Sequence, residues 1–256
     1  MARHVDMKIA ILGYGKMGHE IERVARLKGI EVKSTIDPNN KEAMHSEISG
    51  ESLSGVDVVI DFTAPSAVVE NVRRVSKLGK SMVVATTGWY EHLDEVKKIV
   101  NESKIGFIYS SNFSIGVSAY LKIIEAAAKI FDRIPDYDVY GFELHHNQKV
   151  DSPSGTAKSI AEVLIKNISR KKKPAFDRME RRIAPDELHF ASLRTGSIPG
   201  THVVGFDSEA DTIEIKHTAR SRSGFAFGAL MASEWISGKK GFYTMDNFVN
   251  ELLRKR

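Results

Sequence analysis

A glycine-rich turn near the N-terminus constrains the fold of this chain more than any other feature. Gly13, Gly15 and Gly18 form the pattern G-x-G-x-x-G between an apolar run, residues 8–12, and a helix-like segment. Glycines at this spacing permit a tight turn and let the backbone approach a pyrophosphate, whose charge the next helix N-terminus stabilises. Asp37 follows a second candidate strand, residues 31–36, where it would accept hydrogen bonds from a ribose diol. The turn therefore predicts a dinucleotide-binding βαβ unit.

Further apolar runs extend this unit into a larger sheet. Strand-like runs alternate with amphipathic helical segments, which is typical of a Rossmann-type, doubly wound parallel sheet. The expected strands are residues 8–12, 31–36, 56–62, 81–85 and 105–109. Beyond residue 113, three strand-like runs follow one another without helices between them, which predicts a second, α+β domain. We expect an α/β chain with a dinucleotide-binding domain of residues 1–113 plus 225–256 and a second domain of residues 114–224.

Two loops after predicted strands extend the cofactor site. Residues 85–88 and 110–113 lie at the same sheet edge as the glycine turn, where open α/β sheets bind ligands, and could line the nicotinamide ribose and carboxamide. The cofactor-binding candidates are Gly13, Tyr14, Gly15, Lys16, Met17, Gly18, Asp37, Ala85, Thr86, Thr87, Ser110, Ser111, Asn112 and Phe113. Asp37 favours NADH because its carboxylate repels a 2′-phosphate, yet Lys16 and Lys41 could offset that repulsion. We therefore expect NADH or NADPH.

Composition excludes several classes of protein. The 256 residues include no cysteine, so disulfides, thiolate metal sites and cysteine nucleophiles are ruled out. The net charge of +4 is compatible with anionic small molecules and too small to argue for nucleic acid. No apolar stretch is long enough to span a membrane, and residues 1–7 lack the apolar run of a signal peptide. We expect a cytoplasmic protein without a membrane or nucleic-acid partner.

The densest cluster of reactive side chains is the segment of residues 143–156. His145 and His146 are adjacent on a predicted strand and point to opposite faces, so we expect no metal chelate from this pair. Histidine and lysine can each deliver a proton near neutral pH, and both attract an anion. Residues 152–156 resemble a helix start whose backbone N–H groups could hold a carboxylate. Histidine and lysine side chains just before such a helix start predict a binding site for a small carboxylic acid.

The same segment resembles the E-x-H-H-x-x-K-x-D-A-P-S-G-T signature of the 4-hydroxy-tetrahydrodipicolinate reductase family, also called dihydrodipicolinate reductase. Further matches occur in the family's order along essentially the whole chain, at residues 13–18, 60–63, 86–88, 112–114 and 194–202. Ser152 replaces the usual alanine, and Asn147 and Gln148 replace a frequent Arg-His pair. The loss of positive charge at these two positions could weaken substrate affinity.

The resemblance implies roles for particular residues. His145 would be the proton donor or acceptor and Lys149 the proton donor, while His146, Gly155 and Thr156 would bind a dicarboxylate substrate. It implies hydride transfer from NAD(P)H to 4-hydroxy-tetrahydrodipicolinate, with loss of water, in lysine and diaminopimelate biosynthesis. It also implies that the second domain binds substrate and assembles a homotetramer.

Two other functions remain open at this point. A nucleotide-sensing regulator could bind DNA through the basic runs at residues 170–173 and 254–256, with Arg178, Arg181 and Arg182. No helix-turn-helix accompanies these charges, which usually lie on solvated loops. A different reductase of the same fold, acting on an aldehyde or an amino acid, is the second alternative. The absence of cysteine disfavours acylating aldehyde enzymes.

Overall fold

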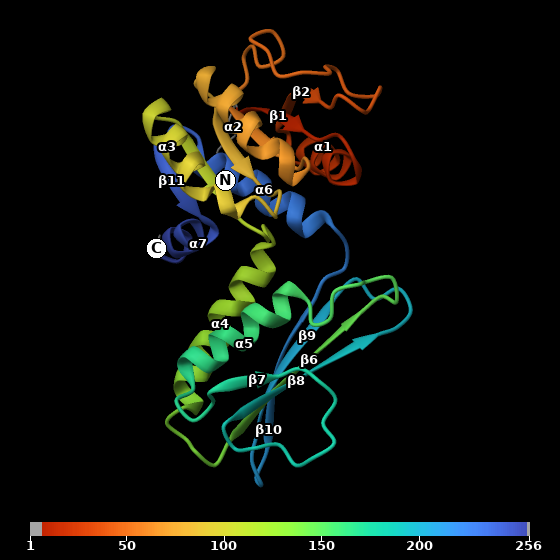
Figure 1. Ribbon diagram of the computed structural model, residues 1–256, viewed down its shortest axis with the longest axis vertical. Helices are drawn as coiled ribbons and strands as arrows, with labels where there is room; N and C mark the ends of the chain where they lie inside the picture. Colours follow the sequence, from red (N-terminus) through yellow and green to blue (C-terminus); the bar gives the residue numbers. More distant parts are fainter. Residues whose placement is uncertain (1–6, 255–256) are drawn as a thin grey trace. The chain divides into compact units, whose positions relative to one another are not determined.

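The computed structural model describes residues 7–254 (Figure 1). The chain start, on which the signal-peptide expectation rests, and Lys255 and Arg256 of the terminal basic run lie outside the described residues. Two compact units divide the chain. One contains the described residues up to Ile115 and from Arg222 onward, and the other is Gly116–Ser221. The functions assigned above to the two domains stay predictions.

The first unit is built on a six-stranded parallel sheet, as the alternating pattern predicted. Its strands lie in the order β11-β5-β4-β3-β1-β2, and every pairing is parallel. The strands are β1 (Lys8–Leu12), β2 (Glu31–Ile36), β3 (Val58–Asp61), β4 (Ser81–Val84), β5 (Gly106–Tyr109) and β11 (Gly241–Thr244). The Rossmann-type fold class is thereby confirmed.

Helices cover both faces of this sheet because alternate residues of a strand point to opposite sides. Ile9 and Ile11 of β1 pack in one cluster with α1 (Lys16–Lys28), α6 (Ser223–Ile236) and α7 (Met245–Arg254). Their neighbours Ala10 and Leu12 pack in a second cluster. This second cluster includes α2 (Val68–Lys77) and α3 (Leu93–Ser103), which follow short 3₁₀ turns at Pro65–Ala67 and Tyr90–His92. The sheet is therefore packed between two apolar clusters, and the glycine turn lies at the end of its strand β1.

The C-terminal segment returns to the first unit and adds a strand that the sequence did not predict. β11 pairs in parallel with β5 at the sheet edge, and α6 fills the face opposite α2 and α3. Gly228 of α6 packs directly against the loop after β5. A Cβ added at this position would lie 1.6 Å from Phe113 O. A glycine at this position is required because the helix backbone touches the loop.

The second unit has a mixed five-stranded sheet in the order β10-β9-β6-β8-β7. Its strands are β6 (Asp138–His145), β7 (Lys173–Ala175), β8 (Glu187–Arg194), β9 (Thr201–Asp207) and β10 (Thr212–Thr218). β6 and β8 are parallel, whereas β9 is antiparallel to both β6 and β10. The α+β class predicted for this part of the chain is confirmed, and only the three-residue edge strand β7 was not predicted.

One face of this second sheet carries both helices of the unit. α4 (Ile115–Phe131) and α5 (Gly155–Asn167) pack on it around Phe190, Val204 and Phe206. Tyr140, Phe142 and Leu144 alternate with the buried residues of β6 and so lie on the opposite face. Across that face Leu193, the register partner of Leu144, is 54% exposed. The sheet therefore presents an apolar face that no helix of its own unit covers.

None of the helices within residues 7–254 is both long enough and apolar enough to cross a membrane.

Candidate active site

The glycine turn has the geometry of an anion cradle. Gly13 has a φ of 85°, and an added Cβ would lie 2.6 Å from Phe62 O. A Cβ on Gly18 would lie 2.5 Å from Gly13 O, so these two glycines allow strand, turn and helix to touch. Gly15, by contrast, has open space beside it and begins α1 without a side-chain cap. The first N–H groups of α1 thus have no capping side chain, and together with this open space they fit a pyrophosphate.

Asp37 lies at the end of β2, next to this turn, and holds it in place. Its Oδ2 accepts a hydrogen bond from Tyr14 N at 2.8 Å, and its Oδ1 accepts one from Asn39 N at 2.8 Å. Asn40 Nδ2 donates to Tyr14 O at 2.6 Å. Each carboxylate oxygen keeps a second lone pair for a ribose hydroxyl. The motif spacing predicted that Asp37 binds a ribose, but it did not predict the hydrogen bonds that hold the glycine turn in place.

The loop after β4 lines a pocket of about 220 Å³ in the first unit. Its walls are Phe62, Thr63, Pro65, Ala85, Thr86 and Thr87. Thr86 Oγ1 donates to Asp61 Oδ1 at 3.0 Å, and Asn71 Nδ2 donates to Asp61 Oδ2 at 2.9 Å. Burial raises the pKa of Asp61, although these and other hydrogen bonds act against the rise. Asp61 does not line the pocket itself but holds the lining residue Thr86 in place by a hydrogen bond. The sequence did not predict this role of Asp61.

The loop after β5 is ordered by its own polar groups. Ser110 Oγ donates to Asn112 O at 2.9 Å and accepts from Asn112 N at 3.0 Å. Asn112 Oδ1 accepts from Ser114 N at 2.8 Å. Phe113 is buried under α6, so it supports the loop, while Ser111 is exposed. The two other cofactor candidates at the start of α1 also differ in exposure. Lys16 is exposed, whereas Met17 packs against the core.

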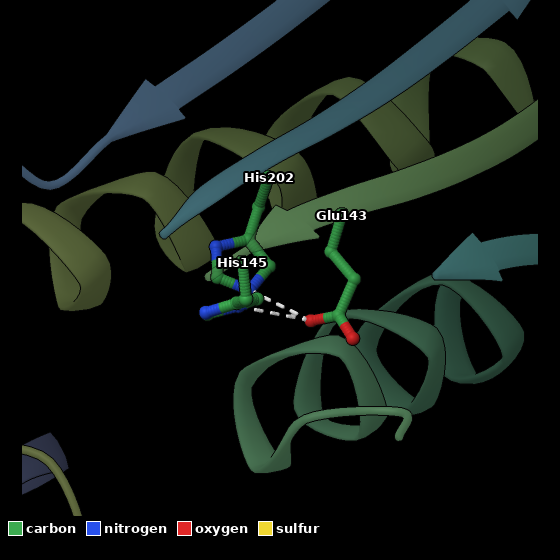
Figure 2. A group of neighbouring side chains, drawn as sticks. All are labelled: Glu143, His145 and His202. Atoms are coloured by element: carbon green, nitrogen blue, oxygen red, sulfur yellow. Dashed lines mark hydrogen bonds and ion pairs between the residues drawn. The ribbon is translucent and has the colours of Figure 1, made fainter. Parts of the chain in front are cut away.

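In the second unit, strand register gathers a buried cluster around Glu143. Glu143 and His145 are two residues apart on β6 and therefore share a face. Glu143 is the register partner of His202 on β9 and of Ser192 on β8, and His145 is the partner of Arg194. Figure 2 shows both imidazoles directed at the Glu143 carboxylate. Glu143, His202, Ser192 and Arg194 were not among the predicted site residues.

The two oxygens of Glu143 have different partners. Oε1 accepts from Ser154 N at 3.0 Å, Ser192 Oγ at 2.8 Å and Arg194 Nη2 at 2.9 Å. Oε2 faces His145 Nε2 at 3.2 Å and His202 Nε2 at 3.3 Å. One carboxylate thus joins the histidine cluster to the start of α5, where Ser154 caps the helix by accepting from Ala157 N.

These contacts shift the proton affinities of the cluster. Burial would raise the pKa of Glu143, but hydrogen bonds from His202, Ser154 and Arg194 outweigh it and hold the pKa well below its usual range. Burial lowers the pKa of His145; Glu143 opposes this change, and His202, Lys149 and Arg194 add to it. The cluster therefore pairs an ionised carboxylate with a neutral imidazole near neutral pH.

Glu143, His145 and His202 also have the donor types of a metal site, with ligand atoms within 4.8 Å of one another. Metal-bound histidines donate their second ring N–H to an acceptor. His202 Nδ1 is buried and has no hydrogen-bond partner among residues 7–254. A lone pair at that atom is less costly than an unpaired N–H. We therefore interpret the cluster as a hydrogen-bonded group in which a neutral His202 carries its proton on Nε2, 3.4 Å from His145 Nε2 and 3.3 Å from Ser154 Oγ.

The loop between β6 and α5 places the other predicted residues beside this cluster. Lys149 Nζ donates to Asp151 Oδ1 at 2.6 Å, and the lysine side chain is 22% exposed. His146 is partly exposed, and its backbone N–H donates to Ile198 O at 2.8 Å. Gly155 has open space beside it at the start of α5. A cationic lysine side chain and free helix N–H groups thus lie on adjacent segments, as a carboxylate site requires.

The departures from the family signature lie on the surface of the same loop. Asn147, Gln148 and Ser152 are all exposed, and Gln148 Nε2 donates to Asn147 Oδ1 at 3.0 Å.

The basic run that suggested DNA binding has internal partners. Lys171 is buried, and its Nζ contacts Pro185 O at 3.1 Å, Glu187 O at 2.9 Å and Asp138 Oδ1 at 2.7 Å. Arg181 contacts both carboxylate oxygens of Glu187, at 2.8 and 2.7 Å. These cations stabilise the edge of the second sheet, which weakens the DNA-binding alternative.

Comparisons with known proteins cover most of the chain. The family model of the dihydrodipicolinate reductase N-terminus matches residues 7–113, and that of the C-terminus matches residues 116–249. The chain is 35% identical over 250 residues to the 4-hydroxy-tetrahydrodipicolinate reductase of Christiangramia forsetii, covering 97% of this chain and 100% of the relative. It is 37% identical over 247 residues to the enzyme of the same name from Staphylococcus haemolyticus, covering 94% and 100%.

A solved structure has the same fold. Dipicolinate-bound dihydrodipicolinate reductase from Paenisporosarcina sp. TG-14 superposes with a TM-score of 0.77 at 24% identity, over 95% of this chain and 99% of that one. The two family models meet near the boundary between the two units, and the two sequence relatives are each matched over their full length. On this evidence, the chain belongs to the 4-hydroxy-tetrahydrodipicolinate reductase family.

Proposed function

We propose that this chain reduces 4-hydroxy-tetrahydrodipicolinate to tetrahydrodipicolinate with NADH or NADPH, with loss of water, in lysine and diaminopimelate biosynthesis. When bound, the nicotinamide supplies the hydride. The observation that carries the proposal is the second-unit cluster in which His145, Lys149 and the open start of α5 lie on adjoining segments. Family membership supports the substrate, and the glycine cradle in the first unit supports the cofactor.

Each predicted residue has a proposed task in this reaction. His146, Gly155 and Thr156 bind the carboxylates of the substrate, because the first N–H groups of α5 and a partly exposed histidine attract anions. Lys149 donates a proton, and its ion pair with Asp151 holds the amine beside the helix start. His145 exchanges a proton with the substrate. Dipicolinate, which is bound in the Paenisporosarcina enzyme, is a suitable probe for this dicarboxylate site.

The proposal is tested by a coupled assay in which a synthase generates the unstable hydroxylated substrate in situ. We expect oxidation of NADH and of NADPH that depends on this substrate. Oxidation of neither cofactor above the substrate-free rate would contradict the proposed function. A reductase for an aldehyde or an amino acid would instead oxidise the cofactor with those compounds.

Cofactor preference follows from the charge beside the glycine turn. We expect a higher kcat/KM for NADH than for NADPH, because the Asp37 carboxylate lies where a 2′-phosphate would approach. Asp37→Asn removes the charge while keeping one acceptor oxygen, so it should shift the ratio toward NADPH by about tenfold, equivalent to about 1.4 kcal/mol of repulsion. A wild-type preference for NADPH above tenfold would contradict this assignment.

The pH dependence follows from the low pKa of His145. We expect kcat/KM to stay constant between about pH 8 and about pH 6.5. It should fall only below about pH 6.5, because the His145 imidazole then becomes protonated. Glu143, His202, Lys149 and Arg194 are the titratable groups that act on it. His145→Gln should remove this acid limb, whereas His189→Asn, elsewhere in the same sheet, should retain it. An acid limb centred above about pH 6.5 would contradict the assignment.

We also propose a homotetramer in the cytoplasm, as the family resemblance implies. The support for assembly is the uncovered face of the second sheet, where Tyr140, Phe142, Leu144 and Leu193 present apolar surface. Light scattering on the purified chain tests the oligomeric state.

A further inference from the structure

The pocket of the first unit has two threonine hydroxyl groups in its wall, those of Thr63 and Thr86. Thr86 Oγ1 lies 3.0 Å from Asp61 Oδ1 and 3.2 Å from Thr63 O. A backbone carbonyl and an ionised carboxylate are acceptors only, so the single hydroxyl proton of Thr86 is directed at one of these two atoms. The Thr86 hydroxyl therefore has only lone pairs to offer a ligand.

Asp61 imposes the same direction on the hydroxyl of Thr63. Asp61 is fully buried, and four donors face its carboxyl group. Oδ1 accepts from Thr63 N at 2.9 Å, Thr63 Oγ1 at 2.7 Å and Thr86 Oγ1, and Oδ2 accepts from Asn71 Nδ2 at 2.9 Å. Only the ionised carboxylate accepts all four of these bonds. Thr63 Oγ1 also accepts from Asn71 Nδ2 at 3.1 Å, so neither hydroxyl has a proton left for the pocket.

The backbone of the loop after β4 supplies the complementary donors. The N–H groups of Thr86 and Thr87 form no hydrogen bond among residues 7–254, so both can bind a ligand oxygen. Thr86 O accepts from Nε1 of the buried Trp89 at 2.7 Å, which fixes the loop from its carbonyl side. The loop thus combines a fixed hydroxyl lone pair with N–H groups. A primary carboxamide is a neutral group that has both an N–H donor and a C=O acceptor.

We propose that Thr86, oriented by Asp61, is a specificity-determining residue whose hydroxyl accepts a hydrogen bond from the carboxamide NH₂ group of the nicotinamide. The inference rests on the proposed function, which places the nicotinamide near residues 85–87, and it adds which part of the cofactor is recognised. An acetyl group has nearly the same shape and keeps the carbonyl oxygen, but it has no N–H to donate. It would leave the buried Thr86 hydroxyl without its donor, which costs binding free energy.

A purely structural role of the same hydroxyl leads to a different expectation. Its bonds to Asp61 and Thr63 O join the loops after β3 and β4. Loss of that connection would loosen the pocket for every cofactor alike. The ratio of the Kd values for a carboxamide and an acetyl cofactor therefore separates recognition from structural support.

Calorimetric titration of the full-length protein with NADH and with its reduced 3-acetylpyridine analogue tests the proposal. At about pH 8, well above the ordinary pKa of a carboxyl group, we expect NADH to bind about tenfold more tightly, the effect of one lost hydrogen bond. Equal Kd values, or no binding of NADH, would overturn the proposal. The titration contains no substrate, so a chain that prefers NADH but fails in the coupled assay would contradict only the proposed reaction.

Thr86→Val removes the hydroxyl while nearly keeping the volume of the side chain. We expect the ratio of the two Kd values to fall from about ten to about one, whatever the change in each value. A folded variant that kept the wild-type ratio would show that Thr86 is not the acceptor and would overturn the proposal.

Thr35→Val is the matched control for this variant. Thr35 is a buried threonine of β2 in the same sheet, and its Oγ1 accepts from the backbone N–H of Met44 at 3.0 Å. It is not among the residues that line the pocket. The control should share the cost of losing a buried hydroxyl while keeping the wild-type ratio of Kd values, because the two cofactors differ only at the pyridine ring.

Asp61→Asn combined with Asn71→Asp tests the orienting group. The exchange reverses the 2.9 Å hydrogen bond between the two side chains and leaves an amide oxygen at position 61 as the acceptor for Thr86. We expect this double variant to keep a Kd ratio of about ten. Asp61→Asn by itself should be less stable, because its NH₂ group would face that of Asn71. A ratio near one in the folded double variant would overturn the proposal.

Discussion

Replacing Lys149 with alanine is expected to lower kcat by about 10²–10⁴-fold, the usual contribution of a positioned proton donor. The ammonium of Lys149 is held 2.6 Å from Asp151 Oδ1 in the loop before α5, beside the proposed carboxylate site. His145→Ala should have an effect of the same size. Both side chains lie in the second unit, so the Kd for NADH, measured by fluorescence, should remain largely unchanged.

The matched control for Lys149 is Lys122→Ala. Lys122 also forms an ion pair within the second unit, 3.3 Å from Glu125, but on the surface of α4. Its loss should change kcat by less than twofold, because exposed ion pairs contribute little. If Lys149→Ala or His145→Ala kept more than half of the wild-type activity, the proposed role of that residue would be wrong.

Gly228→Ala is expected to destabilise the protein by about 3 kcal/mol. The added Cβ would lie 1.6 Å from Phe113 O and 2.8 Å from Phe113 C, both backbone atoms that no rotamer change can move. The helix must therefore move away from the loop after β5. Because that loop carries Ser110, Ser111 and Asn112, NADH binding should weaken as well. Thermal unfolding and NADH titration measure the two effects.

Gly224→Ala, one turn earlier in α6, is the control for this change. A Cβ at Gly224 would lie 3.6 Å from Ser114 Oγ, an ordinary contact, and alanine favours a helix more than glycine does. This variant should be neutral or slightly more stable. Equal melting temperatures for the two variants would show that α6 does not need the close approach at Gly228.

Local patterns were sufficient to predict most of the fold. The nearly continuous apolar run at residues 56–62 and the G-x-G-x-x-G turn indicated buried parallel strands, and the structure has them. β11 was not predicted because Gly241–Thr244 is a short edge strand whose residues are all only partly buried. Its strand character comes from pairing with β5, a contact distant in sequence.

The site was predictable only where its residues are close in sequence. His145, Lys149 and the start of α5 occupy one segment, so their chemistry could be inferred from spacing. Glu143 and His202 meet through the antiparallel register of β6 and β9, which periodicity does not define. A buried glutamate two residues before a histidine on a strand was the available signal, since both side chains must share a face.

The central claim is that the His145–Lys149 cluster and the reduced nicotinamide act on one dicarboxylate. A crystal structure of the chain with NADH and dipicolinate tests it most directly. We expect dipicolinate on Thr156 and the first N–H groups of α5, its ring about 3–3.5 Å from C4 of the nicotinamide, with the His145 imidazole and Lys149 Nζ facing that ring. Dipicolinate bound away from these residues, or a nicotinamide that no copy in the crystal brings to it, would contradict the claim.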